Sequence, residues 1–364
     1  MSRRGKKSKA GKIILLSVLG ALLIAVIAGG IGIYSFISNI RKDMEGDPTQ
    51  KEMRNIQVEP GDSTRTIAAK LQEAGIIDYS WLFVNEAQEA GLAKKLQIGH
   101  YEFCVGASYA EILNVLKKAP NYRPSVRIGF PEGTEVQDII DRFLEKGEES
   151  GAAWTREGFE RAINADYDCA LIPAVGTLAE GVPAYARLEG FLYPDTYDFF
   201  LDATEEELFA KMIAQFEKKA TAAGLAEKAA ANNMTVYEAM ILGSIIQKES
   251  GNVADFALIS SVFNNRLKIN MKLQSDATVS YMIPKEERLA SCTSEQLNKD
   301  TAYNVYIRYG LCPTPICCAR IEAAVAACEP EASEYYYFIG TPAGETLFSK
   351  TYEEHMVKVN KYLR

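Results

Sequence analysis

The stretch ILGSIIQKES, residues 241–250, decides how the second half of this chain is interpreted. Its apolar residues are spaced for a helix, in which successive side chains turn by about 100°. Glu249 follows Leu242, Ile245 and Ile246 by seven, four and three positions, so its carboxylate falls on the apolar side. Gln247 falls on nearly the opposite side. The pattern therefore singles out Glu249 as the polar residue of this helix that needs an explanation.

A carboxylate on an apolar face points to acid catalysis. Loss of hydration raises the pKa of a glutamate above its usual value of about 4.3, and a glutamate protonated near neutral pH is a general acid. Two structural alternatives stand beside this interpretation: an ion pair with an arginine such as Arg266, or a helix end from which Glu249 reaches solvent. Thr235 and Glu238 form a T-x-x-E capping box, which predicts the start of the helix.

An aromatic and acidic segment precedes this helix. EGFLYPDTYDF, residues 189–199, surrounds a Pro-Asp turn and includes Glu189, Tyr193 and Asp195. Aromatic rings can stack on sugar rings, and carboxylates accept hydrogen bonds from hydroxyls, so the segment suits a carbohydrate platform. It is equally suited to be a tyrosine-rich corner of a core.

A polar segment follows the helix. VFNNRLKINMKLQSDATVSYMI, residues 262–283, passes from a helix into a loop rich in hydrogen-bonding side chains. These side chains belong to Asn265, Gln274, Ser275, Asp276 and Thr278. Many polar groups beside one acid predict a groove that binds carbohydrate.

The N-terminus carries a membrane signal. Residues 1–12 form a tail with six basic residues and no acidic one, and residues 13–40 are 28 uncharged, mostly apolar positions. About 20 such residues cross a bilayer as a helix, and the basic tail predicts a cytoplasmic N-terminus with the rest of the chain outside the cell membrane. A cleaved secretory signal has a shorter apolar core and a small-residue cleavage site, which SFISNIRKD does not offer. We therefore expect a single-pass anchor.

Charge and cysteine content narrow the possible partners. Of the 40 basic residues six lie in the tail, whereas the chain has 48 acidic residues, so the remainder is strongly acidic. Such a surface repels the phosphates of nucleic acids, whereas a neutral or amphoteric polymer remains a plausible partner. The seven cysteines lie in no repeated C-x-x-C pattern beside histidine, so we expect neither a metal nor another cofactor. They are interpreted as small buried hydrophobic residues or as one disulfide.

The chain predicts an α+β protein with several parts. After a linker at 41–54, residues 55–122 alternate strands and amphipathic helices in the order β-α-α-β-α. APNYRPS closes this module with two prolines. Residues 123–364 are predicted to be a helix-rich domain with short strands.

Five ordered motifs give the chain a family resemblance: EGFLYPDTY, SIIQKES, VFNNRLKINMKLQSDATVSY, AYNVYIRYGL and FSKTYEEHMVKVNKYL. Together they resemble the YceG-like family of endolytic murein transglycosylases, also called the MltG type. The resemblance extends over nearly the whole chain and implies a LysM-like βααβ module at 55–122 and a catalytic domain at 123–364. It also adds Tyr303 and Asn304 to the expected substrate-binding residues.

The resemblance implies a reaction and its catalyst. Members of the family cleave nascent peptidoglycan strands between N-acetylmuramic acid and N-acetylglucosamine and leave a 1,6-anhydromuramoyl end. The second glutamate of the family's E-K-E-[ST] stretch corresponds to Glu249, which implies that this residue acts first as acid and then as base. A place near a peptidoglycan synthesis complex is implied as well. Three alternatives stay open: a weakened or inactive scaffold that binds peptidoglycan, a hydrolase of the same polymer that uses Glu189, Asp195 or Asp276 as a second carboxylate, and a soluble small-molecule lyase, which the anchor disfavours.

The chain departs from the family pattern at three places. Gln247 replaces the first glutamate, and Ala277 replaces a proline after QSD. The loop that usually reads GLPPGPI followed by NPG reads GLCPTPI followed by Cys317, Cys318 and Ala319. We expect the last change to alter the shape of a loop that lines the glycan groove.

Overall fold

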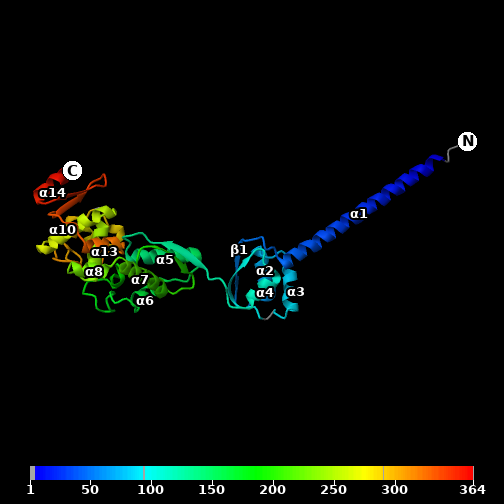
Figure 1. Cartoon of the computed structure of the whole chain (residues 1–364), viewed down its shortest axis with the longest axis horizontal. Helices are drawn as coiled ribbons and strands as arrows, with labels where there is room; N and C mark the ends of the chain where they lie inside the picture. Colours follow the sequence, from blue (N-terminus) through cyan, green and yellow to red (C-terminus); the bar gives the residue numbers. More distant parts are fainter. Residues whose placement is uncertain (1–4, 93–94, 290, 364) are drawn as a thin grey trace. The chain divides into compact units, whose positions relative to one another are not determined.

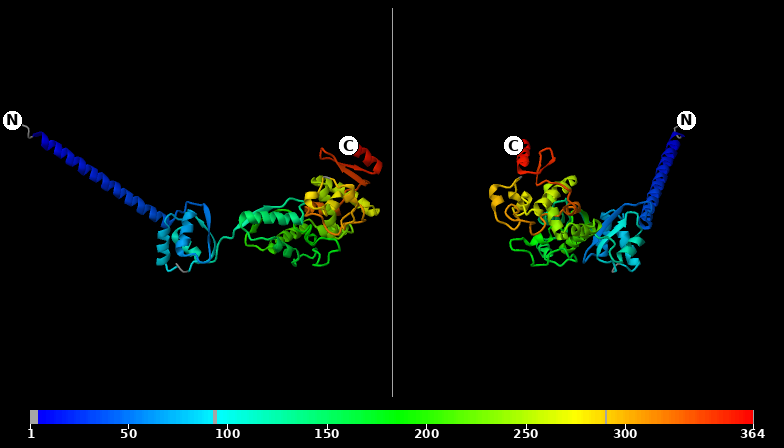
Figure 2. Two further views of the ribbon diagram at one scale, coloured as in Figure 1. Left: turned by 180° about the vertical axis from the view of Figure 1, so that it is seen from behind. Right: turned by 60° about the vertical axis from the view of Figure 1, so that its left-hand side comes forward.

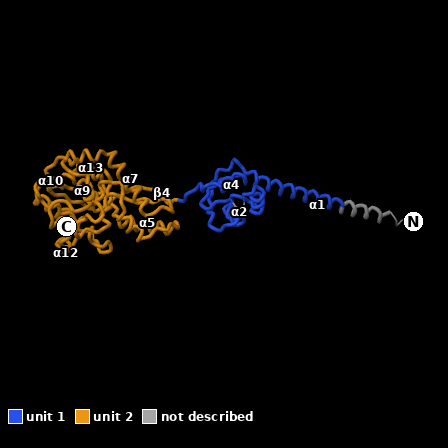
Figure 3. Tube along the Cα trace, turned by 90° about the horizontal axis from the view of Figure 1, so that it is seen from below, with its two compact units in different colours: residues 1–124 blue, residues 125–364 orange. Residues whose placement is uncertain are grey.

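The computed structural model describes residues 5–92, 95–289 and 291–363 of the chain. These residues form two compact units, residues 1–124 and 125–364, coloured separately in Figure 3. Within the described residues the strands pair only as antiparallel two-stranded sheets, and both units contain far more helix than strand. The predicted mixture of helices and short strands is therefore confirmed as α+β.

The first unit begins with one long helix (Figure 1). Its elements are α1 Gly5–Glu45, β1 Met53–Val58, α2 Thr64–Glu73, α3 Ser80–Glu89, β2 Gly99–Cys104 and α4 Tyr109–Leu116. Residues Leu19–Glu45 of α1 are long and apolar enough to cross a membrane. An N-terminal apolar helix that fits a single-pass anchor is thus present, and it continues into residues predicted to be linker.

The module after α1 has the predicted order β-α-α-β-α. Ser63 caps α2 by accepting a hydrogen bond from the Thr66 amide, as S/T caps do. Strands β1 and β2 pair with Ile56 opposite Tyr101, and both side chains are buried against the helices. Asp43 near the end of α1 accepts hydrogen bonds from the amides of Asp78 (2.9 Å) and Tyr79 (3.0 Å). These contacts attach the last turns of α1 to the module.

The second unit carries most of the helices, as Figure 1 shows. Its elements, with η marking short 3-10 helices, are β3 Ser125–Gly129, α5 Val136–Ser150, α6 Arg156–Ile163, η1 Ala184–Leu188, β4 Thr196–Phe200, α7 Glu205–Ala222, α8 Leu225–Ala231, α9 Val236–Glu249, η2 Val253–Asp255, α10 Phe256–Lys268, α11 Asp276–Ser280, η3 Lys285–Glu287, α12 Ser294–Asn298, α13 Ile321–Cys328, β5 Tyr337–Gly340, β6 Thr346–Ser349 and α14 Tyr352–Tyr362. Both views in Figure 2 show the β5–β6 hairpin beside α14.

Helix α9 lies at the centre of this unit. The predicted capping box is confirmed, since Thr235 accepts a hydrogen bond from the Glu238 amide and the Glu238 side chain accepts one from the Thr235 amide. Two hydrophobic clusters meet on α9, one including Met240 and the other including Ile245. Helix α9 is therefore buried on several sides along most of its length, and its last residue, Glu249, is half-buried.

Helix α9 is buried on more than its apolar side. Every residue from 239 to 247 is buried, including Gln247, which falls on nearly the opposite side from Glu249. The physical reason is Gly243, where an added Cβ would lie 2.7 Å from Cα of Ala324 on α13. The missing side chain lets α13 pack closely against the side of α9 that the sequence pattern left unassigned.

Candidate active site

Glu249 is the last residue of α9 and lies half-buried. The backbone of Ser250 turns to an extended conformation, which ends the helix directly after the carboxylate. Ser275, the residue before α11, donates a hydrogen bond from its hydroxyl to Oε1 of Glu249 at 2.5 Å. The end of one helix and the start of another therefore meet at this carboxyl group.

The surroundings of Glu249 favour its protonated form. Burial raises the pKa of Glu249 above its ordinary value, and the nearby negative charge of Asp276 raises it further. The hydrogen bond from Ser275 and the positive charge of Arg266 oppose this rise of the pKa. The net result is a Glu249 pKa above its ordinary value.

Asp276 is positioned by two donors. Its Oδ1 accepts a hydrogen bond from the Tyr306 hydroxyl, and its Oδ2 accepts one from the Cys292 amide at 3.0 Å. Both carboxylate oxygens are thus engaged in holding the start of α11 against two later segments. These two bonds fix the orientation of the Asp276 carboxylate.

Arg266 does not neutralise Glu249 through an ion pair in the part of the chain that the structure describes. Its guanidinium donates to the carbonyl oxygens of Tyr336, at 2.7 Å, and Leu273. It also lies over the ring of Tyr337, 5.3 Å from the centroid. The alternative in which Arg266 pairs with Glu249 is therefore not the observed arrangement. The positive charge of Arg266 lowers the pKa of Glu249 without a direct ion pair.

The other polar residues predicted after α9 serve several purposes. Gln274 is exposed beside Ser275 and has a left-handed backbone with φ of 53°. Its backbone N–H donates a hydrogen bond to the carbonyl oxygen of Val305. Thr278 is buried and donates to the Ser275 carbonyl at 2.8 Å. The Asn265 side chain donates to the carbonyls of Ser333 and Tyr335. Of these residues, Gln274 presents its side chain to solvent next to the Glu249–Ser275 contact.

Tyr303 and Asn304 are both fully buried. The Tyr303 hydroxyl shares a hydrogen bond of 2.7 Å with the hydroxyl of Thr314. The Asn304 amide donates to the carbonyls of Leu297 and Lys299, and its oxygen accepts from the Tyr306 amide. These bonds support the segment that brings Tyr306 to Asp276.

The aromatic and acidic segment lies in a different environment from Glu249. Glu189 is fully buried and accepts hydrogen bonds from the Val136 amide and the Tyr281 hydroxyl. Tyr193 is buried in the larger hydrophobic cluster. Asp195 accepts hydrogen bonds from the amide of Thr196 and the side chain of Gln215, both at 2.8 Å. The structure thus assigns this segment mainly to the core-corner alternative.

Gln247 lies beside the residues that precede α5 and α13. Its side-chain oxygen accepts a hydrogen bond from the Arg320 amide at 3.2 Å, and its Cγ lies 3.6 Å from the position of a Cβ added to Gly133. Neither contact involves Glu249 or Ser275. A neutral amide at position 247 therefore fits its surroundings without a change at the Glu249 carboxyl.

The unusual loop at 312–319 is part of the core. Cys312, Cys317 and Cys318 are free thiols and almost fully buried, as are Thr314 and the residues at 316 and 319. These buried side chains do not reach solvent, and the expected effect of the loop on a glycan groove stays a prediction. Small cysteine and alanine side chains suit a segment packed against α9. There the Ser244 hydroxyl accepts a hydrogen bond from the Ile316 amide.

Three residues near the site escaped the sequence analysis as site residues. Tyr306 lies in the motif AYNVYIRYGL, so its motif was a usable signal. Glu135 and Arg288 lie in no recognised motif and meet only through the tertiary structure. Lys248, the neighbour of Glu249, contacts the same Glu135 carboxylate at 2.9 Å.

Comparison with known proteins gives one consistent family. The sequence pattern of the YceG-like family matches residues 56–361. An endolytic murein transglycosylase of Bacillus subtilis is 29% identical over 346 residues, which cover 93% of this chain and 91% of the relative. One of Streptococcus pneumoniae is 26% identical over 85% of this chain, which spans 58% of that relative's length. The crystal structure of a YceG-like protein from Listeria monocytogenes is similar, with a TM-score of 0.55, 26% identity, and 85% of this chain and 99% of that chain covered.

Proposed function

Because the chain belongs to the YceG-like family, we propose that it is an endolytic lytic transglycosylase of peptidoglycan with Glu249 as its catalytic acid and base. The observation that carries this assignment is the single half-buried carboxyl group at the end of α9, with its pKa raised by burial and its Oε1 held by Ser275. The bond cleaved joins N-acetylmuramic acid to N-acetylglucosamine in nascent strands.

One carboxyl group suffices for this reaction. Protonated Glu249 donates its proton to the glycosidic oxygen as the C1–O bond breaks through an oxocarbenium-like state. The resulting carboxylate then removes the proton from the C6 hydroxyl of the muramoyl residue, whose oxygen bonds to C1 and forms the 1,6-anhydro ring. The substrate supplies the nucleophile, whereas most glycosidases that use water require a second free carboxylate.

The engaged state of Asp276 favours the lyase over a hydrolase. A second carboxylate must be free to accept a proton from water or to attack C1. Both oxygens of Asp276 accept hydrogen bonds from other parts of the chain, while Glu189 is buried and Asp195 is bonded to β4 and α7. Ser275 acts on Glu249 directly, and the exposed Gln274 is the neighbouring group best placed to contact sugar hydroxyls.

The remaining parts of the chain are consistent with an enzyme that acts on a polymer close to a membrane. We propose that α1 anchors the protein with its N-terminus in the cytoplasm, so that the catalytic domain meets strands as they are made. The module with order β-α-α-β-α is the proposed LysM-like part. A neighbouring peptidoglycan synthesis complex is the proposed partner, and crosslinking to a glycan synthase in intact cells is its direct test.

Product analysis tests the function. The detergent-solubilised chain is incubated with uncrosslinked glycan strands, and the products are identified by mass spectrometry. We expect internal fragments with 1,6-anhydromuramoyl ends from the wild type and at least a 10³-fold lower rate from Glu249→Gln, which keeps the shape but loses the proton. Fragments with reducing ends would establish a hydrolase, and a folded wild type that binds strands without cutting them would establish a scaffold.

A further inference from the structure

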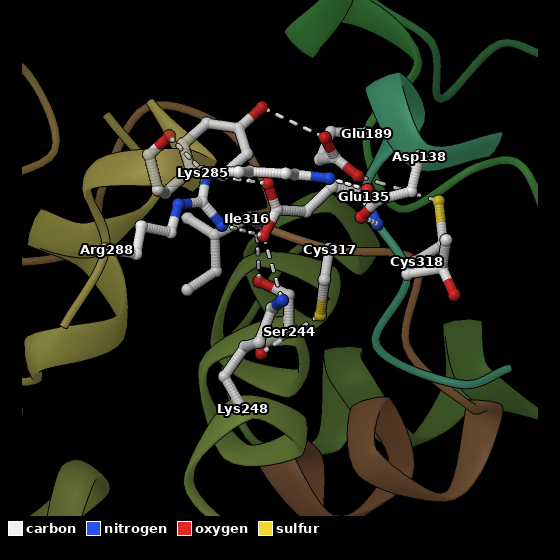
Figure 4. Close-up of polar contacts among 12 residues, drawn as sticks. Glu135, Asp138, Glu189, Ser244, Lys248, Lys285, Arg288, Ile316, Cys317 and Cys318 are labelled. Carbon is white, nitrogen blue, oxygen red and sulfur yellow. Dashed lines mark hydrogen bonds and ion pairs between the residues drawn. The ribbon is translucent and has the colours of Figure 1, made fainter. Parts of the chain in front are cut away.

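An ion cluster is centred on the buried carboxylate of Glu135 and includes Lys248, the residue before Glu249. The Glu135 side chain, in a residue 4% exposed, accepts hydrogen bonds from Lys248 at 2.9 Å and from Arg288 at 2.7 and 2.9 Å (Figure 4). Burial alone would raise the pKa of Glu135, but Arg288 and Lys248 hold this pKa below its ordinary value. The cluster is therefore charged, with one carboxylate joined to two cations.

Both cations belong to or contact segments that carry residues of the candidate active site. Lys248 directly precedes Glu249 in α9, so its ion pair fixes the end of that helix. Arg288 donates to the carbonyls of Tyr281, at 3.2 Å, and Ile283, at 2.9 Å, which follow α11. The start of α11 carries the Ser275 contact to Glu249. Glu135 thus links the end of α9, through Lys248, to the end of α11, through Arg288. The Ser275–Glu249 hydrogen bond links the start of α11 back to α9. We call this closed series of contacts the Glu135 circuit.

A second contact ties the same two elements together. Glu189 accepts hydrogen bonds from the Val136 amide, at 3.2 and 3.3 Å, and from the Tyr281 hydroxyl at 3.0 Å. Val136 directly follows Glu135, and Lys285, which follows α11, pairs with Asp138 in the first turn of α5. Figure 4 shows Glu135 and Glu189 on neighbouring segments of this cluster. Several connections therefore join the start of α5 to the end of α11, and together they resist rotation of α11.

The position of the Ser275 hydroxyl relative to Glu249 depends on this circuit. Misplacement by about 1 Å at a reacting group lowers rates about 10²-fold, even when its cause is remote from the chemistry. Glutamine at position 135 would offer one acceptor where the carboxylate offers two, and its NH₂ group would face a cation. The circuit would then open at Lys248 or at Arg288.

We propose that Glu135 is a positioning residue that holds Glu249 and Ser275 in contact, acting through Lys248 on α9 and through Arg288 on the end of α11. This role rests on the proposed transglycosylase function only for its effect on rate, because the predicted change in geometry exists without turnover. Glu135 itself touches no substrate in this scheme.

A double-mutant cycle tests the effect on rate. Glu135→Gln, Ser275→Ala and the double variant are made in the full-length chain in detergent and assayed on uncrosslinked glycan strands. We expect Glu135→Gln to lower kcat about 10- to 100-fold with KM changed less than about twofold. The double variant should be no more than about twofold slower than the slower single variant, since both break one contact. Multiplied effects of the two changes, or an unchanged kcat, would overturn the proposal.

Two further variants separate positioning from folding. Glu132→Gln removes a neighbouring carboxylate that pairs with Arg320 at 2.6 Å and has no bond to α11, so we expect near wild-type kcat. Arg288→Lys keeps the charge but loses the bidentate contact with Glu135, so it should show the same loss of kcat. This variant replaces Glu135→Gln in the test if Glu135→Gln does not fold. Wild-type kcat in folded Arg288→Lys would contradict the proposal.

A structural measurement keeps the inference independent of activity. In crystals of wild type and Glu135→Gln, the distance between Ser275 Oγ and Glu249 Oε1 is compared. We expect the wild-type hydrogen bond to be lost in the variant, with a separation above about 3.5 Å. An intact bond in the variant would reject the positioning role. If the wild type shows this geometry but cuts no strand, the proposed function fails while the positioning role survives.

Discussion

Ser275 donates a hydrogen bond of 2.5 Å to Oε1 of Glu249, which joins the residue before α11 to the last residue of α9. The two residues are 26 positions apart in the chain, and the hydrogen bond brings one hydroxyl to the one carboxyl group that the proposed chemistry uses. This hydroxyl stabilises the carboxylate more than the acid. It therefore sets the pH range in which Glu249 can donate a proton.

Removing that hydroxyl should shift the pH dependence of cleavage. In Ser275→Ala the Glu249 carboxylate loses a hydrogen bond that favours its ionised form, so the pKa of Glu249 rises. Since the reaction needs protonated Glu249, the fall of kcat/KM at high pH should move upward by the same amount. The pH profile of strand cleavage measures this shift, with the exposed Ser294→Ala as control. A profile that stays in place or moves down would contradict the role of Ser275.

Asp276→Asn should slow the reaction without changing its products. The amide replaces one acceptor with a donor, which weakens the contacts to the Tyr306 hydroxyl and the Cys292 amide that hold α11. We expect kcat to fall about 10-fold, because Ser275 is the neighbouring residue and moves with α11. Mass spectrometry should still find only anhydro ends, and Tyr306→Phe should have a similar but smaller effect. Reducing ends made by the wild type and lost in Asp276→Asn would identify Asp276 as a hydrolytic carboxylate.

Glu189→Gln should flatten the dependence of stability on pH. Burial, together with the nearby negative charge of Glu135, raises the pKa of Glu189 to about 8. In the unfolded chain this carboxyl group ionises near pH 4.5, so the folded protein binds one more proton between about pH 4.5 and 8. The stability that protonated Glu189 contributes is complete below this range and is lost as the pH rises through it.

Urea unfolding at pH 5 and pH 8 measures this contribution. The free energy of unfolding of the wild type should fall between these values by at least about 1 kcal/mol more than that of Glu189→Gln, since one pKa unit corresponds to about 1.4 kcal/mol. Equal slopes for the two chains would mean that Glu189 is ionised in the folded state.

Gly243→Ala should destabilise the second unit. Alanine normally favours a helix over glycine by up to about 1 kcal/mol, but here its Cβ would lie 2.7 Å from Cα of Ala324. Overpacking of a core costs about 1 to 3 kcal/mol, so the net effect is a loss of stability. Thermal unfolding compares this variant with Gly340→Ala, where an added Cβ meets nothing within 4 Å. A higher melting temperature for Gly243→Ala would contradict the close packing of α9 and α13.

Local patterns in the sequence were enough to predict several elements and the central carboxyl group. The capping box at Thr235 and Glu238 joins residues three positions apart, so neighbouring residues alone specify it. The apolar run at 13–40 predicts a helix that fits a membrane through composition alone. Glu249 stood out because a charged residue interrupts an apolar pattern, and its raised pKa agrees with that interpretation.

Long-range packing decided what surrounds that carboxyl group. Glu135 and Arg288 are 153 positions apart, and no periodic pattern relates them. The close approach of α13 at Gly243 buries the side of α9 that carries Gln247, and Glu189 is enclosed by residues far from it in the chain. Periodicity reports which face of one element is apolar, whereas burial and partner choice follow from how separate elements pack. The sequence thus singled out Glu249 as the proposed acid, while the tertiary fold selected Ser275 and Asp276 as its neighbours, because only the fold brings the start of α11 to the end of α9.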